Sequence, residues 1–354
     1  MVIRAKEYDI VIERGAINRS GELASAAVGS GKRAVVVSDD NVYPLYGRIL
    51  EASLKDAGFE MCDAFVFPHG EQSKNMTTLD RLLCYLGEKG LTRTDVIFAL
   101  GGGVVGDLAG FAAAVYLRGI RFIQLPTTVV AMTDSSVGGK TAVDLASGKN
   151  LAGAFHNPSL VICDIDTLGT LPELYFSDGM AEVIKYGYIG DSSLLSAITA
   201  SDAHLIMDDV VAMCVADKIA VVSEDLYDNG VRQKLNLGHT IGHAIEAVSG
   251  YTIPHGHAVA VGMAMITRAA ERRGICAAGT ADNMSALLNK YALSDTVPES
   301  GEYTAEKLYA AALHDKKKRG GKITLVIPTV GGSSELFEYP MEELYNVIRD
   351  GMTK

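Results

Sequence analysis

Four of the eight histidines in the chain fall within one stretch, NLGHTIGHAIEAVSGYTIPHGHAVAVGM, residues 236–263. His239 and His243 are four residues apart, which places both imidazoles on one face of a helix. His255 follows Pro254 in an expected turn that leads into an apolar helix. Neutral imidazoles from two elements can bind zinc, but a catalytic zinc needs a third protein ligand and an open position. The stretch therefore predicts a metal centre.

The third ligand of this centre is expected on another helix. In DGMAEVIKYG, Glu182 offers a carboxylate, and Lys185 lies about one turn further along. The alternative is that the histidines are surface residues or hydrogen-bonded core residues. The density of the cluster favours metal binding.

A glycine-rich turn follows an expected strand in ALGGGVVGD, residues 99–107. Its G-x-G-x-x-G pattern allows backbone N–H groups to approach a phosphate at a helix N-terminus. The acid that usually follows about 20 residues downstream is missing, since that region reads FIQLPTT; Asp39 lies upstream instead. A tight strand–helix turn is the alternative. PHGEQSK and LPTT also follow expected strands, which favours a pyrophosphate site.

A second polar loop or hairpin is TDSSVGGKTAVDLASGKN, residues 133–150. It brings together Asp134, Lys140, Lys149 and Asn150. Lysines and an amide suit a phosphate or carboxylate ligand. A solvated hairpin is the alternative.

The first half of the chain alternates between strand and helix patterns. Strands are expected at residues 33–39, 61–67, 95–100, 121–126 and 160–164, and helices at 42–58, 77–90 and 106–117. This alternation predicts an α/β domain with a mostly parallel sheet. Such sheets bind ligands beyond the carboxyl ends of their strands, where the glycine-rich turn lies.

Helical patterns dominate after about Leu171. They are expected at residues 172–189, 192–199, 204–223, 235–249, 258–274, 281–291 and 304–313, and only ITLVIP, 323–328, resembles a strand. The change in pattern predicts two domains, residues 1–170 and 171–354, joined near GTLPE.

Composition narrows the class of protein. The 354 residues are 48% apolar and 21% charged, which supports a large core. A net charge of −11 argues against a nucleic acid or an anionic membrane as partner. The N-terminus lacks an apolar signal segment, and the five cysteines are scattered. We therefore expect a cytoplasmic protein with free thiols that binds no membrane.

Taken together and in order, these motifs resemble those of the 3-dehydroquinate synthases, within the sugar-phosphate cyclase group. The resemblance covers almost the whole chain and rests on PHGEQSK, GGGVVGDLAGF, LPTT, DSSVGGKT, GKN, DGMAEVIKYG, LNLGHTIGHAIE and HGHAVAVGM. It implies an α/β N-terminal dinucleotide-binding domain and a mostly α-helical C-terminal metal-binding domain.

The resemblance also implies roles for individual residues. The ligands of Zn²⁺ or Co²⁺ would be Glu182, His239 and His255, leaving His243 for catalysis. The residues implied to bind NAD are Asp39, Asn41, Glu71, Lys74, Gly103, Val104, Val105, Gly106, Asp107, Thr127, Thr128, Lys140, Lys149, Thr167 and Leu168. Those implied to meet the substrate are Asp134, Lys140, Asn150, Lys185, Lys218, Arg232, Asn236 and one lysine of the DKKK run, Lys316 or Lys317. Arg118 is implied to reach the phosphate site of a neighbouring subunit, and hence a homodimer.

The implied activity is that of a phosphate-eliminating carbon–oxygen lyase in the shikimate pathway of aromatic amino acid biosynthesis. It converts 3-deoxy-D-arabino-heptulosonate 7-phosphate, a phosphorylated sugar acid, to 3-dehydroquinate while NAD is recycled. Three alternatives are a polyol or glycerol-phosphate dehydrogenase, a cyclase that makes a cyclitol, and an inactive NAD-binding protein. DSSVGGKT and GKN favour the synthase over the first two, and the intact ligand set argues against the third.

Some positions depart from the usual family pattern. His69 replaces an aspartate, His257 a glutamate, Asp144 an asparagine and Asn157 a glutamine, and Asp225 is followed by Leu226 in place of glutamate. None of these changes removes an implied metal ligand. The roles of His69 and His257 stay open; His257 could be an alternative ligand or could hydrogen-bond a residue of the metal centre without binding the ion.

Overall fold

The computed structural model describes residues 1–225, 230–316 and 321–353. It divides into two compact units, Met1–Leu171 with Met207–Ile219, and Pro172–Ile206 with Ala220–Lys354. One helix, α7 (Met207–Glu224), belongs partly to each unit. The assignment of a cofactor role to residues 1–170 and a metal role to 171–354 stays a prediction.

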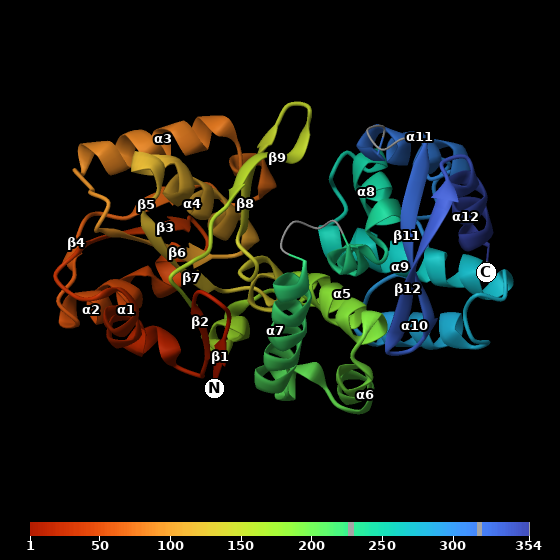
Figure 1. Ribbon diagram of the computed structural model, residues 1–354, viewed down its shortest axis with the longest axis horizontal. Helices are drawn as coiled ribbons and strands as arrows, with labels where there is room; N and C mark the ends of the chain where they lie inside the picture. The colour runs from red at the N-terminus through yellow and green to blue at the C-terminus, as the bar shows by residue number, and fades with distance from the viewer. Residues whose placement is uncertain (226–229, 317–320, 354) are drawn as a thin grey trace. The chain divides into compact units, whose positions relative to one another are not determined.

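The first unit is built on an eight-stranded sheet (Figure 1). Its strand order is β1 (Val2–Arg4), β2 (Asp9–Ile12), β10 (Leu160–Cys163), β7 (Arg121–Pro126), β6 (Val96–Gly101), β3 (Arg33–Asp39) and β4 (Glu60–Met61), and β5 (Phe65–Phe67) also pairs with β3. Strands β1 and β2 are antiparallel, and the other pairings of this sheet are parallel. The predicted α/β class is therefore confirmed, although the strand expected at 61–67 is divided between β4 and β5.

Helices cover both faces of this sheet. They are α1 (Ser20–Val28), α2 (Arg48–Asp56), α3 (Met76–Glu88) and α4 (Gly103–Val115). Along β3, Ala34 and Val36 pack into the core shared with α1 and α2, whereas Val35 and Val37 pack into the core shared with α3 and α4. Because both faces are buried, the strands are almost continuously apolar, as is usual for parallel sheets.

The polar stretch 133–150 includes most of a β-hairpin. Strands β8 (Lys140–Leu145) and β9 (Gly148–Phe155) pair antiparallel. Val143 of β8 is buried in the core beside α3 and α4, which holds the hairpin against the first unit.

The second unit is mostly helical. Its elements are α5 (Glu173–Ile189), α6 (Ser192–Ala200), α8 (His239–Val248), α9 (His255–Arg272), α10 (Thr280–Lys290), α11 (Ala305–Lys316), α12 (Glu343–Met352) and the antiparallel strands β11 (Lys322–Val330) and β12 (Ser333–Pro340). Two expectations were wrong. A second strand, β12, is present, and His255 is the first residue of α9 and does not lie in a turn.

Glycines bring α8 and α9 close together. A β-carbon on Gly262 would overlap the backbone oxygen of Gly238, and one on Gly242 would lie 3.0 Å from Cα of Val259. The backbones of the two helices are therefore in direct contact. This brings together His239 and His255, the first residues of α8 and α9. In the described part of the chain, we find no helix with the length and apolarity that crossing a membrane requires.

Candidate active site

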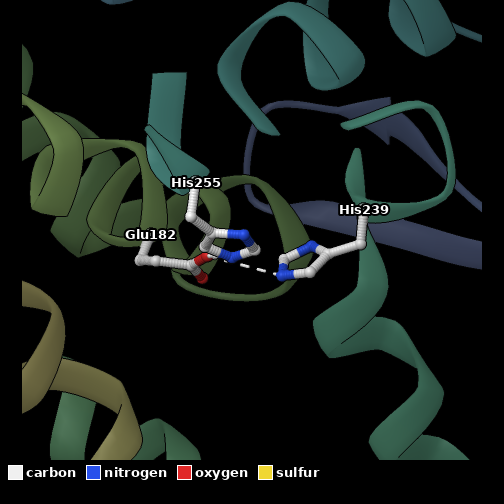
Figure 2. A group of neighbouring side chains, drawn as sticks. All are labelled: Glu182, His239 and His255. Atoms are coloured by element: carbon white, nitrogen blue, oxygen red, sulfur yellow. Dashed lines mark ion pairs between the residues drawn. The ribbon is translucent and has the colours of Figure 1, made fainter. Parts of the chain in front are cut away.

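Three side chains of the second unit converge on one point. Figure 2 shows Glu182, His239 and His255 pointing toward one another. Oε1 of Glu182 lies 3.4 Å from Nε2 of His239 and 3.3 Å from Nε2 of His255. The carboxylate comes from the middle of α5, and the imidazoles come from the first residues of α8 and α9.

The outer nitrogen of each imidazole has its own acceptor. Nδ1–H of His239 donates to the carbonyl of Leu237 at 3.0 Å, and Nδ1–H of His255 donates to Oε2 of Glu246 at 3.2 Å. Metal-bound histidines usually donate their second N–H in this way, which fixes the tautomer and the orientation of the ring. Both rings therefore present Nε2 to the same point.

The geometry fits a tetrahedral ion. Two ligand atoms at 2.0–2.1 Å from a tetrahedral zinc lie about 3.4 Å apart, and this agrees with the distances from Glu182 to the two imidazoles. One carboxylate and two imidazoles leave a fourth position for a substrate oxygen. Glu182, His239 and His255 therefore fit a catalytic divalent metal.

Neighbouring charges keep Glu182 ionised, which a metal ligand requires. Burial would raise the pKa of Glu182, but the neighbouring Lys185 ammonium and the two imidazoles hold it well below its usual range. Burial lowers the pKa of His239. Burial opposes a charge on His255 as well, yet its hydrogen bonds to Glu182 and Glu246 raise its pKa to about 10. A metal ion would displace the His255 proton, as metal binding to histidine generally does.

A second group of possible ligands shares one imidazole with the first. His243, Glu246 and His255 also have ligand atoms within 4.8 Å of one another. Glu246, however, receives the outer nitrogen of His255, whereas Glu182 faces the inner nitrogens of two imidazoles. This contrast favours the Glu182 set as the ligands. The His243 ring lies 5.5 Å from that of His239 and 5.8 Å from that of His255, measured between centroids, so it borders the cluster.

The other predicted site residues of the second unit differ in burial. Lys185 is buried and pairs with Glu182 one turn away on α5. Arg232 is buried in the short helix Val231–Asn236, and Asn236 is exposed at its end. Lys316 ends α11, but its side chain lies outside the described part of the structure, as does all of Lys317. The structure thus places Lys185 beside Glu182.

In the first unit, the predicted NAD-binding residues follow the carboxyl ends of the parallel strands. Asp39 ends β3, Glu71 and Lys74 follow β5, Gly103 to Asp107 follow β6, Thr127 and Thr128 follow β7, and Thr167 and Leu168 follow β10. Parallel strands place these ends on one edge of the sheet, where ligands of such folds bind. Asp39 accepts the backbone N–H of Asn41 and of Val42, so it shapes its own turn.

A buried lysine joins several of these loops. Nζ of Lys74 lies 2.7 Å from Glu71, 3.3 Å from Asp107 and 3.9 Å from Asp144. Burial raises the pKa of Asp107 to about 6, although Lys74 opposes the shift. Burial disfavours the charge of Lys74, yet the surrounding carboxylates raise its pKa. The lysine therefore holds the loop after β5 against the start of α4.

The turn from β6 to α4 is shaped for close approach. A β-carbon on Gly102 would lie 3.1 Å from Cγ2 of Thr128, and one on Gly106 would lie 2.6 Å from Oε1 of Gln124. Oγ1 of Thr127 is buried without a hydrogen-bond partner in the residues that the structure describes. A buried hydroxyl in that state is unusual, and a bound nucleotide would supply the missing partner.

The hairpin residues are partly brought together. The backbone N–H of Asn150 donates to Asp144 at 2.7 Å, and Asn150 adopts a left-handed backbone conformation with φ 55°. Lys140 opens β8 and Lys149 lies in β9. Separately, Lys218 of α7 donates to Oδ1 of Asp134 at 2.8 Å and to its carbonyl at 2.6 Å.

Arg118 stands apart from these groups. It is exposed, and it follows Leu117 in a turn where both residues have positive φ. Within the described ranges, its side chain has no hydrogen bond or ion pair. An exposed guanidinium of this kind is available to a second molecule.

Sequence reasoning missed two residues that contact the ligand-bearing turn of α9. Glu246 lies three residues beyond His243 on α8, a spacing that places both on one helix face but does not reveal that Glu246 hydrogen-bonds His255. Asp178 of α5 was not noted at all, and it accepts two hydrogen bonds from His257. The spacing of Asp178 from Glu182, four residues along one helix, was the available signal.

The fold is shared with cyclases whose structures hold NAD⁺ and a metal ion, and with dehydrogenases. A structure of 2-deoxy-scyllo-inosose synthase complexed with carbaglucose-6-phosphate, NAD⁺ and Co²⁺ is 25% identical, with TM-score 0.87 over 99% of this chain and 100% of that one. The 2-epi-5-epi-valiolone synthase ValA from Streptomyces hygroscopicus subsp. jinggangensis 5008, with NAD⁺ and Zn²⁺ bound, is 25% identical with TM-score 0.87, covering 99% and 98%. Glycerol dehydrogenase from Schizosaccharomyces pombe shares the fold at 18% identity and TM-score 0.65, covering 99% and 90%.

The particular family follows from closer relatives. Residues 64–178 match the family model of the 3-dehydroquinate synthase N-terminal part, and residues 179–318 match that of the C-terminal part. The 3-dehydroquinate synthase of Streptococcus suis (strain 05ZYH33) is 43% identical over 97% of both chains, and that of Enterococcus faecalis (strain ATCC 47077 / OG1RF) is 41% identical over 95% of this chain and 94% of its own. The chain belongs to the 3-dehydroquinate synthase family, so the predicted family is confirmed.

Proposed function

We propose that the chain converts 3-deoxy-D-arabino-heptulosonate 7-phosphate to 3-dehydroquinate and phosphate, with Glu182, His239 and His255 as its metal ligands. The observation that carries the ligand assignment is the single carboxylate oxygen that faces two Nε2 atoms at 3.3 and 3.4 Å. Membership of the synthase family, at 43% identity over 97% of the chain, supports the reaction. The dehydrogenases share only the fold, at 18% identity or below.

The cofactors of this reaction are NAD and a divalent metal, Zn²⁺ or Co²⁺. When bound, the ion would supply Lewis acidity to a substrate oxygen, and NAD would supply a reversible hydride acceptor. The predicted NAD-binding residues, which follow the carboxyl ends of β3, β5, β6, β7 and β10, would hold NAD in the first unit. The buried Thr127 hydroxyl and the glycines after β6 support this assignment.

His243 and Lys185 are the proposed proton-handling groups. His243 borders the proposed ligands from the same face of α8, one turn beyond His239, and an imidazole beside the substrate position can transfer a proton. Lys185 is buried against Glu182, so its ammonium is held at one place, beside the proposed metal, where it can donate to a substrate oxygen.

The proposed phosphate-binding groups are cations and an amide. They are Lys140, Asn150, Arg232 and a lysine of the DKKK run, Lys316 or Lys317. Charge-assisted hydrogen bonds from such groups hold a phosphate and orient the reacting atoms. The Lys218–Asp134 pair fixes a carboxylate for the substrate hydroxyls.

We further propose a cytoplasmic homodimer in which Arg118 completes the phosphate site of the neighbouring subunit. The exposed, unpartnered guanidinium in the described structure supports this arrangement. The five cysteines are all free thiols, which is the usual state in a reducing compartment.

The test is turnover of the heptulosonate phosphate with NAD⁺ well below the substrate concentration. We expect full conversion, one phosphate released per substrate, 3-dehydroquinate identified by NMR, and no accumulation of NADH. Stoichiometric NADH, or consumption of substrate without phosphate release, would overturn the proposal in favour of a dehydrogenase.

A further inference from the structure

Helix α9 begins at the proposed metal ligand His255 without a side-chain cap of its own. The residue at its N-terminal boundary is Pro254, whose side chain has no hydrogen-bond acceptor. The first N–H groups of a helix have no partner within the helix. The turn that carries His255 therefore needs an acceptor from another part of the chain.

Asp178 of α5 supplies this acceptor. Its Oδ1 accepts the backbone N–H of His257 at 3.1 Å and Nδ1–H of the same residue at 3.2 Å. The side chains of His257 and Asp178 are only 19% and 14% exposed, so water competes little for these bonds. A carboxylate also suits this place because the N-terminal end of a helix carries a partial positive charge.

Gly256 places the two helices in direct contact at this point. A β-carbon there would collide with the backbone oxygen of Asp178 and would lie 2.9 Å from Oδ1 of that residue. The backbone of α9 therefore rests on α5 between the two histidines. On one side of the contact His255 meets Glu182, and on the other side His257 meets Asp178.

Contacts with Asp178 and Glu182 together fix the orientation of the first turn of α9 against α5. Glu182 and Asp178 are four residues apart, so they lie on one face of α5. Glu182 and Glu246 contact only the imidazole of His255, so without Asp178 the backbone of the first turn of α9 could rotate about the contact at Gly256, and Nε2 of His255 would move. Bonds on both sides of Gly256 prevent that rotation.

We propose that Asp178 and His257 are positioning residues that hold the metal ligand His255 toward Glu182 and His239. This inference rests on the metal site proposed above. It also gives His257 a task in place of the family's usual glutamate. The ionised side chain of a glutamate has no hydrogen to donate, so Asp178 would receive only the backbone N–H.

The experiment measures Zn²⁺ affinity by competition with a chromogenic chelator, and the visible absorption spectrum of the Co²⁺-loaded protein. In Asp178→Ala both bonds are lost, and we expect affinity to fall about 10–100-fold, as is typical when an outer partner of a metal ligand is removed. The Co²⁺ bands should change, because the imidazole is no longer held in place. Asp178→Asn keeps an acceptor oxygen and should recover most of the affinity, and His257→Ala, which keeps the backbone bond, should lose less than Asp178→Ala.

Asp191 provides a matched control within the same unit. It caps α6 by accepting the N–H of Ser193 at 2.8 Å and of Leu194 at 3.0 Å. Asp191→Ala therefore removes a helix-capping carboxylate of the same kind from a helix that carries no proposed ligand. We expect it to lower thermal stability while Zn²⁺ affinity and the Co²⁺ spectrum stay unchanged.

Each outcome decides the proposal. Wild-type affinity and an unchanged spectrum in Asp178→Ala would overturn it, and so would an equal loss of affinity in Asp191→Ala. If Asp178→Ala does not fold, wild-type affinity in both Asp178→Asn and His257→Ala would overturn it. The metal site itself fails if wild-type binding does not depend on Glu182; Glu182-dependent binding with unaffected Asp178 variants rejects only the positioning role.

Discussion

Glu246 and His255 are joined by a hydrogen bond from Nδ1–H to Oε2 at 3.2 Å. Glu246 is buried on α8, and His255 opens α9, so the bond connects two helices that each carry a proposed ligand. It sets which nitrogen of His255 faces Glu182.

Removal of this acceptor should weaken metal binding. We expect Glu246→Ala to lower Zn²⁺ affinity about 10–100-fold, because the His255 ring loses the partner that fixes its tautomer. Glu246→Gln should lose less, since its amide oxygen still accepts the proton. Chelator competition measures both. Unchanged affinity in Glu246→Ala, in a protein that unfolds at the wild-type temperature, would contradict this role.

The ligands themselves should be distinguishable from the neighbouring histidine. After dialysis against chelator and reloading, elemental analysis should find about one ion per wild-type chain and little in Glu182→Ala or His239→Ala, since a three-ligand site loses most of its affinity with one ligand. His243→Ala should keep its ion and lose about 10²–10⁴-fold in turnover, the usual contribution of a proton-transfer group. An occupied site in His239→Ala together with an empty one in His243→Ala would reverse the assignment.

The sequence allowed the central strands of the sheet to be predicted because both of their faces are buried, although the short buried strand β2 was not predicted. RAVVVSD, VIFALG and RFIQLP are apolar for this reason, and they form β3, β6 and β7. Strand β12 was missed because SSELFEYP is largely polar, and most of its residues are exposed or half-buried. Its register comes from pairing with β11, which no local pattern reveals.

The site was predictable in part for similar reasons. His239 and His243 are four residues apart, so the sequence alone predicted that they share one helix face. The convergence of Glu182 with two other helices depends on tertiary packing, and only the family resemblance indicated it. The helical start at His255 was missed because Pro254 and Gly256 favour a turn, whereas the contact of Gly256 with Asp178 is what requires glycine there.

The proposed role of Arg118 predicts complementation between two inactive variants. When Arg118→Ala and Lys140→Ala subunits are mixed, a hybrid dimer has one site with both residues intact. Random exchange between two equal populations should then restore about a quarter of wild-type activity, because half of the dimers are hybrids. Mass-labelled subunits would prove that exchange occurs. If exchange is complete and activity stays absent, Arg118 does not act on a neighbouring subunit.

The raised pKa of Asp107 predicts a pH-dependent stability. Burial raises its pKa from 3.8 to about 6 in the folded protein, so the folded state binds more protons than the unfolded state between these values. The contribution of Asp107 to stability is therefore greatest below pH 4 and is lost as pH rises through 6. Asp107→Asn lacks this titration, and its unfolding free energy relative to wild type should increase by about 2–3 kcal/mol from pH 4 to pH 7.

Denaturant unfolding at several pH values measures that difference. Thr127→Val provides a control on the neighbouring strand end, because it alters a buried hydroxyl without altering a charge. Its stability difference from wild type should not change with pH. A constant difference for Asp107→Asn over the same range would show that Asp107 titrates normally.

Helix α7 has a consequence for how genes of this family can recombine. Its residues Met207–Ile219 belong to the first unit, where Arg14 pairs with Asp208 at 2.6 Å and Lys218 pairs with Asp134 at 2.8 Å, although the main segment of that unit ends at Leu171. A single crossover near codon 171 would therefore take Arg14 and Asp134 from one parent and Asp208 and Lys218 from the other. In a chimaera between two homologues, both partners of each pair come from the same parent only when codons 207–219 are inherited together with the first 171.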